Sequence, residues 1–395
     1  MVVGQSGGPT VVINQSLVGA VKQAMKHPEI TGIYGMKHGI KGILNEEFID
    51  LKQEDDAMLE KIANTPASAL GTSRHKPTPE DCEKIFAVFE KYNVKYWFYI
   101  GGNDSAETCH IVNEIARKNN YELRVFHIPK TVDNDLMGTD HSPGYPSAAK
   151  YVALCFMGNN LDNRALPGVK IDIVMGRHAG WLTAAAVLGR KYEDDGPHLV
   201  YVPEHPVSLE QIVHDIDNVY EKYQRCIVAV SEGVKTPDGK LLGEGFINEK
   251  DMHGNVQLSG SGALGDSLAN YVKEHSRHKK LRVRADTLGY AQRSFPNIYS
   301  DIDKQEARMV GEEAVKYAMK GDIDGSVALK RIGDYAVEAD LIKLSEVAQK
   351  TKLLPKNYIN KEGNNITDAF LDYALPLVGE LPEPVRLKEV AVIKR

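Results

Sequence analysis

The sequence contains few cysteines and no long apolar run. Its four cysteines are widely separated, and no two of them form a C-x-x-C pair, which argues against a disulfide scaffold and against a zinc framework. We therefore expect reduced, packed thiols and a cytoplasmic protein. No stretch approaches the roughly eighteen consecutive apolar residues of a membrane span, and residues 1–5 show no secretory signal, so we expect no membrane partner. The cysteines are Cys82, Cys109, Cys155 and Cys226.

An excess of positive charge is also absent. Lysine and arginine number 48 against 54 aspartates and glutamates, which gives a net charge of −6. A nucleic-acid-binding protein would normally be basic, so we expect no nucleic-acid partner, and any anion site must be local. The chain is 42% hydrophobic and 26% charged, close to the globular average, which excludes disorder, collagen and coiled coil. A length of 395 residues predicts two domains, with three as the alternative.

The Walker motif of nucleotide-binding proteins is missing, and the nucleophile motif of hydrolases lacks its usual context. No G-x-x-x-x-G-K-[ST] motif occurs, which excludes a Walker-type NTPase. Residues 4–8 match the G-x-S-x-G pattern of a hydrolase, but only three residues precede Gly4, whereas a nucleophile elbow needs several strands before it. A serine hydrolase is therefore not expected.

A third pattern supports an alternative function. Residues 260–265 match G-x-G-x-x-G, and Asp286 follows about twenty residues later, as in a dinucleotide site. The preceding segment, 250–255, is polar and turn-forming, so the required entry strand is missing. A surface loop before a helix explains the glycines better, and an NAD(P)-dependent oxidoreductase remains a remote alternative.

The order of elements predicts an α/β fold. Apolar strands end at glycine-rich or polar turns, and helical periodicity follows these turns along most of the chain. This alternation is typical of helices layered on parallel sheets, whose ligands lie beyond the carboxyl ends of the strands. After about residue 337 the pattern weakens. The predicted strands are 2–3, 94–100, 123–128, 169–175, 226–230 and 281–284, and the predicted helices begin near Pro9 and cover 105–118 and 181–188.

Two of the glycine-rich turns could cradle phosphate. Gly7 and Gly8 precede Pro9, a residue suited to the first turn of a helix, whose free N–H groups attract anions. An ordinary strand–helix turn is the alternative. The segment 101–105, Gly-Gly-Asn-Asp-Ser, is a second glycine-rich turn before a predicted helix. Its polar side chains add oxygens suited to Mg²⁺. Asp104 beside a phosphate would be repulsive unless a cation compensates it.

The segment 130–135, Lys-Thr-Val-Asp-Asn-Asp, supplies that cation. In an extended turn, Thr131, Asp133 and Asp135 point the same way. One carboxylate can act as general base towards a sugar hydroxyl, and a second can hold a metal or tune the first. Lys130 can neutralise a transferring phosphoryl group. A solvated polar loop is the alternative. So many polar and charged residues directly after a strand favour a catalytic or binding site over such a loop.

Three further segments carry groups that bind sugar phosphates. Residues 175–181 follow one predicted strand, and Glu232 follows the next. The segment 284–293 contains two arginines and a tyrosine. Arginine forks suit phosphate, and a carboxylate suits sugar hydroxyls. We interpret His178 as a packed or capping side chain. Together the turns predict sites for a polyphosphate donor, a metal and a phosphorylated sugar.

These turns, in this order, resemble the 6-phosphofructokinase family from Gly7 to about Arg293. The resemblance implies that Asp133 accepts the proton of the 1-hydroxyl of fructose 6-phosphate. It also implies that Arg284 comes from a neighbouring subunit, and hence a homodimer or homotetramer. The motifs that carry it are residues 6–8, 71–74, 101–105, 130–135, 175–177, 232 and 284–293. The implied sugar-phosphate ligands are Thr131, Met175, Gly176, Arg177, Glu232, Arg284, Tyr290 and Arg293, and the implied donor ligands are Gly7, Gly8, Arg74 and Gly102.

Two positions indicate whether the phosphate donor is ATP or pyrophosphate. Members that use ATP typically carry glycine where this chain has Asp104 and Lys130, and both residues look like the pyrophosphate-dependent branch of the family. An aspartate there fills space and repels the α-phosphate of ATP, because like charges about 4 Å apart cost roughly 1 kcal/mol in water and several at lower dielectric. Lys130 offsets that charge and stabilises the transferring group. An ATP-dependent enzyme is the alternative within the family.

The chain departs from the family pattern at three positions. Asn103 stands where an aspartate associated with Mg²⁺ is usual. We assign the metal to Asn103 together with Asp135, and binding through water or directly to pyrophosphate are the alternatives. Gly168 lies seven residues before Met175, where bacterial ATP-using members often have an interface arginine. Either this sugar contact is absent, or Arg164 or Lys170 replaces it. Tyr290 replaces the usual histidine, as in many pyrophosphate-dependent members.

The resemblance as a whole implies a cytoplasmic phosphotransferase of two doubly wound, Rossmann-like α/β domains with mainly parallel sheets. It would transfer phosphate reversibly from pyrophosphate to fructose 6-phosphate with Mg²⁺, in glycolysis and gluconeogenesis. Residues 1–143 and about 292–345 would form the donor domain, and residues 144–291 and about 346–395 the acceptor domain. A non-catalytic sugar-phosphate-binding regulator is a further alternative, although a pure binder has no need of a base such as Asp133.

Overall fold

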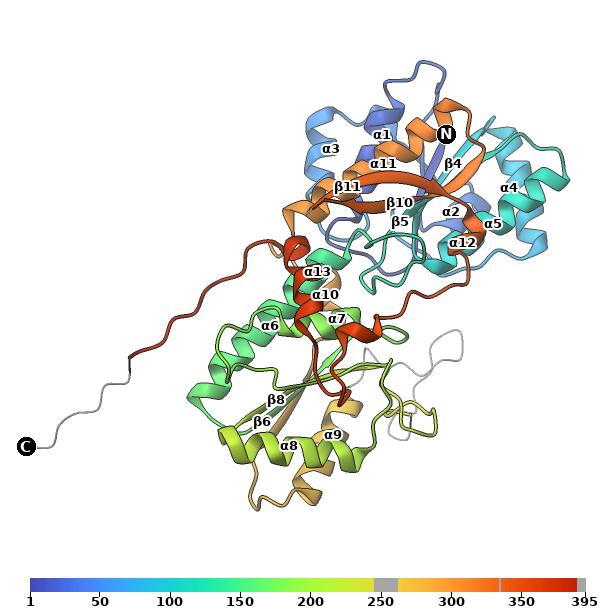
Figure 1. The fold of residues 1–395 in the computed structure, drawn as a ribbon. Coiled ribbons are helices and arrows are strands. Elements are labelled where there is room, and N and C mark those ends of the chain that lie inside the picture. Colours follow the sequence, from blue (N-terminus) through green and yellow to red (C-terminus); the bar gives the residue numbers. More distant parts are fainter. Residues whose placement is uncertain (245–261, 334, 389–395) are drawn as a thin grey trace, which may run out of the picture.

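The protein has two lobes, each built on one β-sheet (Figure 1). The structure is a computed structural model that describes residues 1–244, 262–333 and 335–388. Within these residues one sheet has seven strands and the other has four. Both sheets are covered by helices on their two faces. The predicted α/β fold with mainly parallel sheets is confirmed.

The seven-stranded sheet is doubly wound about its first strand. In sheet order its strands are β11 (Ala336–Ile342), β10 (Asp324–Ile332), β5 (Arg124–Pro129), β4 (Tyr96–Gly101), β1 (Val2–Gln5), β2 (Tyr34–Met36) and β3 (Phe48–Asp50). Only the edge strands β3 and β11 run antiparallel. The strand order reverses between β1 and β4, which is where open α/β sheets bind their ligands.

Helices cover both faces of this sheet because its strands are apolar on both sides. Along β4, Trp97 and Tyr99 pack in one cluster, and Phe98 and Ile100 pack in the opposite one, as the two-residue period of a strand requires. The first face carries α2 (Ile40–Leu44), α4 (Pro79–Lys91), α5 (Asn103–Lys118) and α12 (Leu344–Val347). The second carries α1 (Ile13–Ala24), α3 (Asp56–Ala63) and α11 (Asp301–Lys320).

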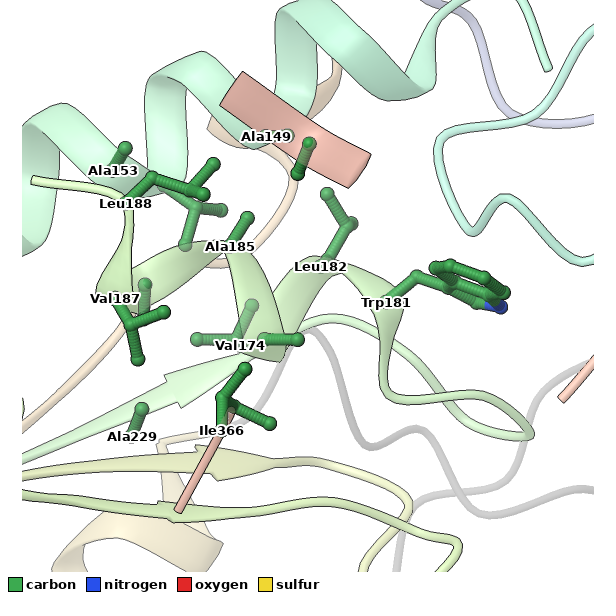
Figure 2. Close-up of a cluster of buried hydrophobic side chains, with 14 of the residues drawn as sticks. Ala149, Ala153, Val174, Trp181, Leu182, Ala185, Val187, Leu188, Ala229 and Ile366 are labelled. Carbon is green, nitrogen blue, oxygen red and sulfur yellow. The ribbon is translucent and has the colours of Figure 1, made fainter. Parts of the chain in front are cut away.

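The four-stranded sheet is parallel throughout, in the order β7 (Leu199–Tyr201), β8 (Cys226–Ser231), β6 (Val169–Val174) and β9 (Val283–Thr287). Its core packs alanines of one helix against a short helical segment, with Val174 and Ala229 of the strands below (Figure 2). The helices of this lobe are α6 (Tyr145–Ala165), α7 (Trp181–Ala184), α8 (Leu209–Tyr223), α9 (Ala263–His275), α10 (Ala291–Ser294) and α13 (Asp368–Val378).

The structure shifts the bounds of several predicted elements, and the first helix and the strand predicted at 281–284 are two examples. The first helix begins at Ile13 and not at Pro9. The carbonyl of Thr10, which would start the helical ladder, instead accepts a hydrogen bond from the Ala67 N–H. The strand predicted at 281–284 is β9, which begins two residues later and extends to Thr287.

The chain after about residue 290 passes between the two lobes. Helix α11 and strands β10 and β11 belong to the first lobe, whereas α13 packs against α6 of the second. The part of the chain after about residue 337, where the sequence pattern is weak, thus includes most of an edge strand, β11, and the helices α12 and α13. The domain boundaries given above stay a prediction.

The closest helix pair in the first lobe depends on glycine. A Cβ added at Gly311 of α11 would collide with the carbonyl oxygen of Ser16 on α1, whereas a Cβ at Gly158 of α6 would meet open space. We expect Gly311→Ala to lower the free energy of unfolding by about 1–3 kcal/mol through overpacking. Gly158→Ala, the matched control, should raise it by up to about 1 kcal/mol. Denaturant unfolding measures both, and equal effects would contradict the packing argument.

Candidate active site

A cavity of about 600 Å³ opens at the carboxyl ends of β1, β4 and β5. The loop after β6 closes it from the second lobe through Arg177 and His178. Parallel strands bring their carboxyl ends to one edge, so turns about 30 to 100 residues apart in the sequence meet here. The predicted site residues that line this cavity are Gly7, Gly8, Arg74, Gly102, Asn103, Asp104, Lys130, Thr131, Asp133, Asp135, Arg177 and Arg293.

Four predicted sugar ligands lie directly behind or beside this cavity. Gly176 precedes Arg177, and its N–H donates to Oε1 of the buried Glu232 at 3.3 Å. Met175 is buried in the core of the second lobe. The ring of Tyr290 lies against the Arg293 guanidinium, 4.7 Å from its centroid. Tyr290 thus lies against Arg293, which lines the cavity, and Glu232 binds the residue that directly precedes the lining residue Arg177.

Arg284 does not line this cavity. It lies on β9, paired in register with Lys170, and both border a separate hollow on that side of the second lobe. Sugar-phosphate binding by Arg284 at such a cavity would involve a second subunit, which stays a prediction. Of the two candidates to replace the interface arginine, Lys170 shares this hollow, whereas Arg164 turns away and donates to Asp194 at 2.5 Å.

The glycines after β1 make room for two cations. A Cβ at Gly7, whose φ is +72°, would lie 3.3 Å from Lys130 Nζ, and one at Gly8 would lie 2.9 Å from Arg293 Cζ. Lys130 Nζ donates to the Gly8 carbonyl at 2.6 Å. Only glycine permits this approach and the positive φ together. We predicted that free N–H groups at a helix N-terminus would bind phosphate here. The structure differs, because the Gly7 N–H donates to the Ser73 carbonyl at 3.3 Å and no helix begins directly after Gly7.

The loop after β5 is a tight turn and not the extended segment we predicted. Asn134 has φ +54°, and Thr131 Oγ1 accepts from the Asp133 N–H at 3.1 Å and donates to Asp135 Oδ1 at 3.3 Å. The Asn134 side chain anchors the turn by donating to the Tyr373 hydroxyl at 3.0 Å. Thr131, Asp133 and Asp135 nevertheless all line the cavity.

Burial shifts the pKa of each ionisable group in this loop. It raises the pKa of Asp133, with Arg293 and Lys130 acting in the opposite direction. It lowers the pKa of Lys130 to about 7, and the charge of Arg293 adds to this effect. Burial and the nearby Asp133 raise the pKa of Asp135 to about 7. Carboxylates and a lysine whose pKa values approach neutrality are typical of proton transfer sites.

The oxygens beside this loop fit a magnesium ion that arrives with a phosphate. Asn103 Nδ2 donates to Asp135 Oδ2 at 2.9 Å. Within the described residues, Asn103 Oδ1 and Asp133 Oδ1 are buried without a hydrogen-bond partner. No group of three His, Cys, Asp or Glu side chains in that part of the chain could hold a metal by itself. Mg²⁺ is usually bound through one or two carboxylates together with substrate phosphates, so this donor set suits it.

Asp104 stands at the outer wall of the cavity, where it forms an ion pair with Lys76. Its side chain is 79% exposed and lies 3.0 Å from Lys76 Nζ, which also contacts Glu107 at 2.9 Å. Gln349 Nε2 donates to Glu107 at 2.5 Å. The wall thus joins α5, the segment after Arg74 and the segment after α12.

Six residues outside the predicted motifs also line the cavity, namely His75, Lys76, Thr108, His178, Gln349 and Thr351. Of the two interpretations of His178, the packed side chain was wrong, because His178 is exposed, and the capping role stays a prediction. Neighbouring atoms still desolvate part of its ring, and this partial desolvation together with the charge of Arg177 lowers its pKa. Lys76 could have been found from its place just after the motif 71–74. Gln349 and Thr351 carry no signal of their own, because they belong to the segment without a clear pattern.

Residues 1–318 match the family model described as phosphofructokinase. The chain belongs to the phosphofructokinase family. A pyrophosphate--fructose 6-phosphate 1-phosphotransferase of Rhodospirillum rubrum is 52% identical over 397 residues, covering 100% of this chain and 98% of that protein. A second protein of that name, from Halomonas elongata, is 36% identical and covers 95% of this chain and 90% of its own length. The crystal structure of a pyrophosphate-dependent phosphofructokinase from Marinobacter aquaeolei is 34% identical, with a TM-score of 0.85 over 100% of this chain and 97% of that one.

Family membership confirms the resemblance drawn from the motifs. Gly260 and Ser261 of the alternative dinucleotide motif lie outside the described residues, and Gly262 directly precedes α9. Among the helices of the described residues, none has the length and apolar character needed to cross a membrane.

Proposed function

We propose that this phosphofructokinase-family protein transfers phosphate from pyrophosphate to the 1-hydroxyl of fructose 6-phosphate. The products are fructose 1,6-bisphosphate and phosphate, and the reaction runs in both directions. The observation that carries the donor assignment is the presence of both Asp104 and Lys130 on the wall of one cavity. The 52% identity to a protein named for this reaction supports it.

The cavity residues have distinct roles in this transfer. Asp133 takes the proton from the 1-hydroxyl as the new O–P bond forms and the bridging P–O bond of pyrophosphate breaks. Lys130 and Arg293 stabilise the negative charge of the transferring group, and Gly7 and Gly8 let them approach. Asn103 and Asp135 would hold Mg²⁺, which neutralises charge on the phosphate oxygens when bound.

Residues of the second lobe and of the segment 284–293 would bind the sugar phosphate, and one of them bears on the oligomeric state. Arg177, Arg293 and Tyr290 would orient the sugar phosphate, and Glu232 would bind sugar hydroxyls or hold the Gly176 backbone. Arg284 would reach the acceptor of a neighbouring subunit, so we propose a homodimer or homotetramer. The first lobe then serves as donor domain and the second as acceptor domain, in a cytoplasmic enzyme of glycolysis and gluconeogenesis.

A donor competition tests the function. The protein is mixed with fructose 6-phosphate, Mg²⁺ and either pyrophosphate or ATP, and fructose 1,6-bisphosphate is followed through coupling to aldolase. We expect product with pyrophosphate only. Product with ATP only would retain Asp133 as base and overturn the donor assignment. No product with either donor would favour a binding protein without catalytic activity.

Asp104 is expected to discriminate between donors. We expect Asp104→Gly to raise the ratio of kcat/KM for ATP to that for pyrophosphate about tenfold, which corresponds to about 1.4 kcal/mol. The change opens space and removes a like charge at the wall, and the exposed side chain leaves no buried partner behind. Asp104→Asn keeps the volume and removes the charge, so comparing the two separates steric from electrostatic exclusion. An unchanged donor ratio in both variants would contradict this role.

A further inference from the structure

The segment from Gln349 to Leu354 runs beside the catalytic loop and contacts both lobes. Its central residue, Lys352, makes three hydrogen bonds to carbonyl oxygens of the segment that follows β5. The Lys352 N–H donates to the Asp135 carbonyl at 2.7 Å. Its Nζ donates to the carbonyls of Thr139 at 3.1 Å and Asp140 at 2.7 Å. A single residue therefore holds both ends of the turn that contains the proposed metal ligand Asp135.

The same residue also contacts the second lobe through Trp181. The Trp181 Nε1–H donates to the Lys352 carbonyl at 3.0 Å, and Lys352 Nζ lies 4.9 Å from the Trp181 ring centroid. Trp181 begins α7, and its ring points away from the aliphatic cluster of this lobe (Figure 2). Only three residues separate it from Arg177, which lines the cavity.

A second contact of the segment secures the same loop of the second lobe. The Leu354 N–H donates to Glu204 Oε1 at 2.8 Å, and the Gly180 N–H donates to the same oxygen at 3.0 Å. Gly180 directly precedes Trp181. The loop 176–181 is thus tied to the segment at two places, and the segment is tied to the turn 135–140 at three.

The chemistry of Lys352 suits a connecting role. The side chain is half-buried, and within the described residues it forms no ion pair with a carboxylate closer than 4.0 Å. Carbonyl oxygens and the face of an indole ring hold its charge instead. An aliphatic side chain would fill this place without the cost of desolvating a cation, but it could not bind two carbonyls and the ring together.

We propose that Lys352 is a positioning residue that sets the distance between Asp133 in the catalytic turn and Arg177 in the loop before Trp181. In-line transfer requires the acceptor hydroxyl and the donor phosphate to be aligned to within about 1 Å, and small misplacements cost up to about a hundredfold in rate. The first lobe holds the donor and the second holds the acceptor, so a link between their loops controls this alignment. This inference rests on the proposed function.

Kinetics of Lys352→Met test the proposal, with Lys350→Met as control. Methionine keeps the length of the side chain and removes the charge and both Nζ hydrogen bonds. We expect kcat with pyrophosphate to fall about tenfold to a hundredfold, while KM for pyrophosphate and for fructose 6-phosphate changes less than about threefold. Lys350 is exposed two residues away, and its replacement should leave both constants unchanged.

A spectroscopic measurement separates positioning from general destabilisation. The chain has two tryptophans, so in a Trp97→Phe background the emission reports on Trp181 alone. We expect Lys352→Met to shift this emission and Lys350→Met to leave it unchanged. Lys352→Gln, which restores one donor, should have an intermediate kcat and serves as the second variant if the methionine variant does not fold.

Two outcomes would overturn the proposal. One is a folded Lys352→Met variant with kcat within about twofold of the parent. The other is an unchanged kcat with a raised KM, which would indicate a binding role. If the parent protein itself shows no turnover with pyrophosphate, the proposed function fails instead, and the Trp181 emission still shows whether Lys352 links the two loops.

Discussion

Replacing Asp133 by asparagine should lower kcat with pyrophosphate and fructose 6-phosphate by about 10²–10⁴-fold, the usual contribution of a general base. Asparagine has the same shape but cannot accept the proton of the 1-hydroxyl. Asp133 lies in the cavity beside Lys130 and Arg293, and one of its oxygens has no hydrogen-bond partner within the described residues. Turnover should fall equally in both directions. Coupling to aldolase measures the forward reaction, and the phosphate-dependent formation of fructose 6-phosphate measures the reverse reaction.

Binding of the sugar is the control for this variant. Calorimetric titration of Asp133→Asn with fructose 6-phosphate should give a Kd within about fivefold of the parent, because the proposed sugar-phosphate ligands are unchanged. A variant that keeps more than about a tenth of the parent kcat would remove Asp133 from the role of base. A variant that no longer binds the sugar would place Asp133 in acceptor binding and not in proton transfer.

Replacing Lys130 by methionine should lower kcat with pyrophosphate by about 10²–10³-fold, the size of effect seen when one preorganised donor to a developing charge is lost. Lys130 Nζ lies against Gly7 and donates to the Gly8 carbonyl, so its charge faces the place where the donor phosphate would bind. Methionine fills the buried space and removes only the charge and the hydrogen bond.

The stability of the Lys130→Met variant separates catalysis from folding. Burial lowers the pKa of Lys130 to about 7, so its charge is unfavourable in the empty cavity. Replacement of a buried charge by an apolar side chain of similar volume is often neutral or stabilising, and the thermal unfolding temperature should not fall. Full activity in a folded variant would contradict the role of Lys130, and loss of folding would show that Lys130 serves structure instead.

The family and most of the central strands could be predicted from the sequence because their signals are local. The apolar run of β4 ends at two glycines, and β5 ends directly before Lys130. Strand period and turn chemistry depend on residues close in the chain. The start of α1 could not be predicted in this way, because the Thr10 carbonyl is bound by Ala67, a residue more than fifty positions away.

The same contrast holds within the site. Asp104, Lys130, Asp133 and Asp135 follow parallel strands, and the edge of a parallel sheet brings such turns together in any doubly wound fold. Their meeting in one cavity was therefore predictable once the strands were placed. His178 was misjudged because its exposure depends on how the loop 176–181 faces the other lobe.

The sequence by itself determined the chemistry of this protein, since the carboxylates, the lysine and the arginines stand in turns whose place at the sheet edge follows from strand order. The tertiary structure alone decided which distant segments complete the cavity. Gln349 and Thr351 reach the cavity from a segment without periodicity. Hydrogen bonds from Gln349 to Glu107 and from Lys352 to two backbone carbonyls hold this segment in place. Backbone carbonyls are the same at every residue, so no sequence pattern records which of them a distant side chain will bind.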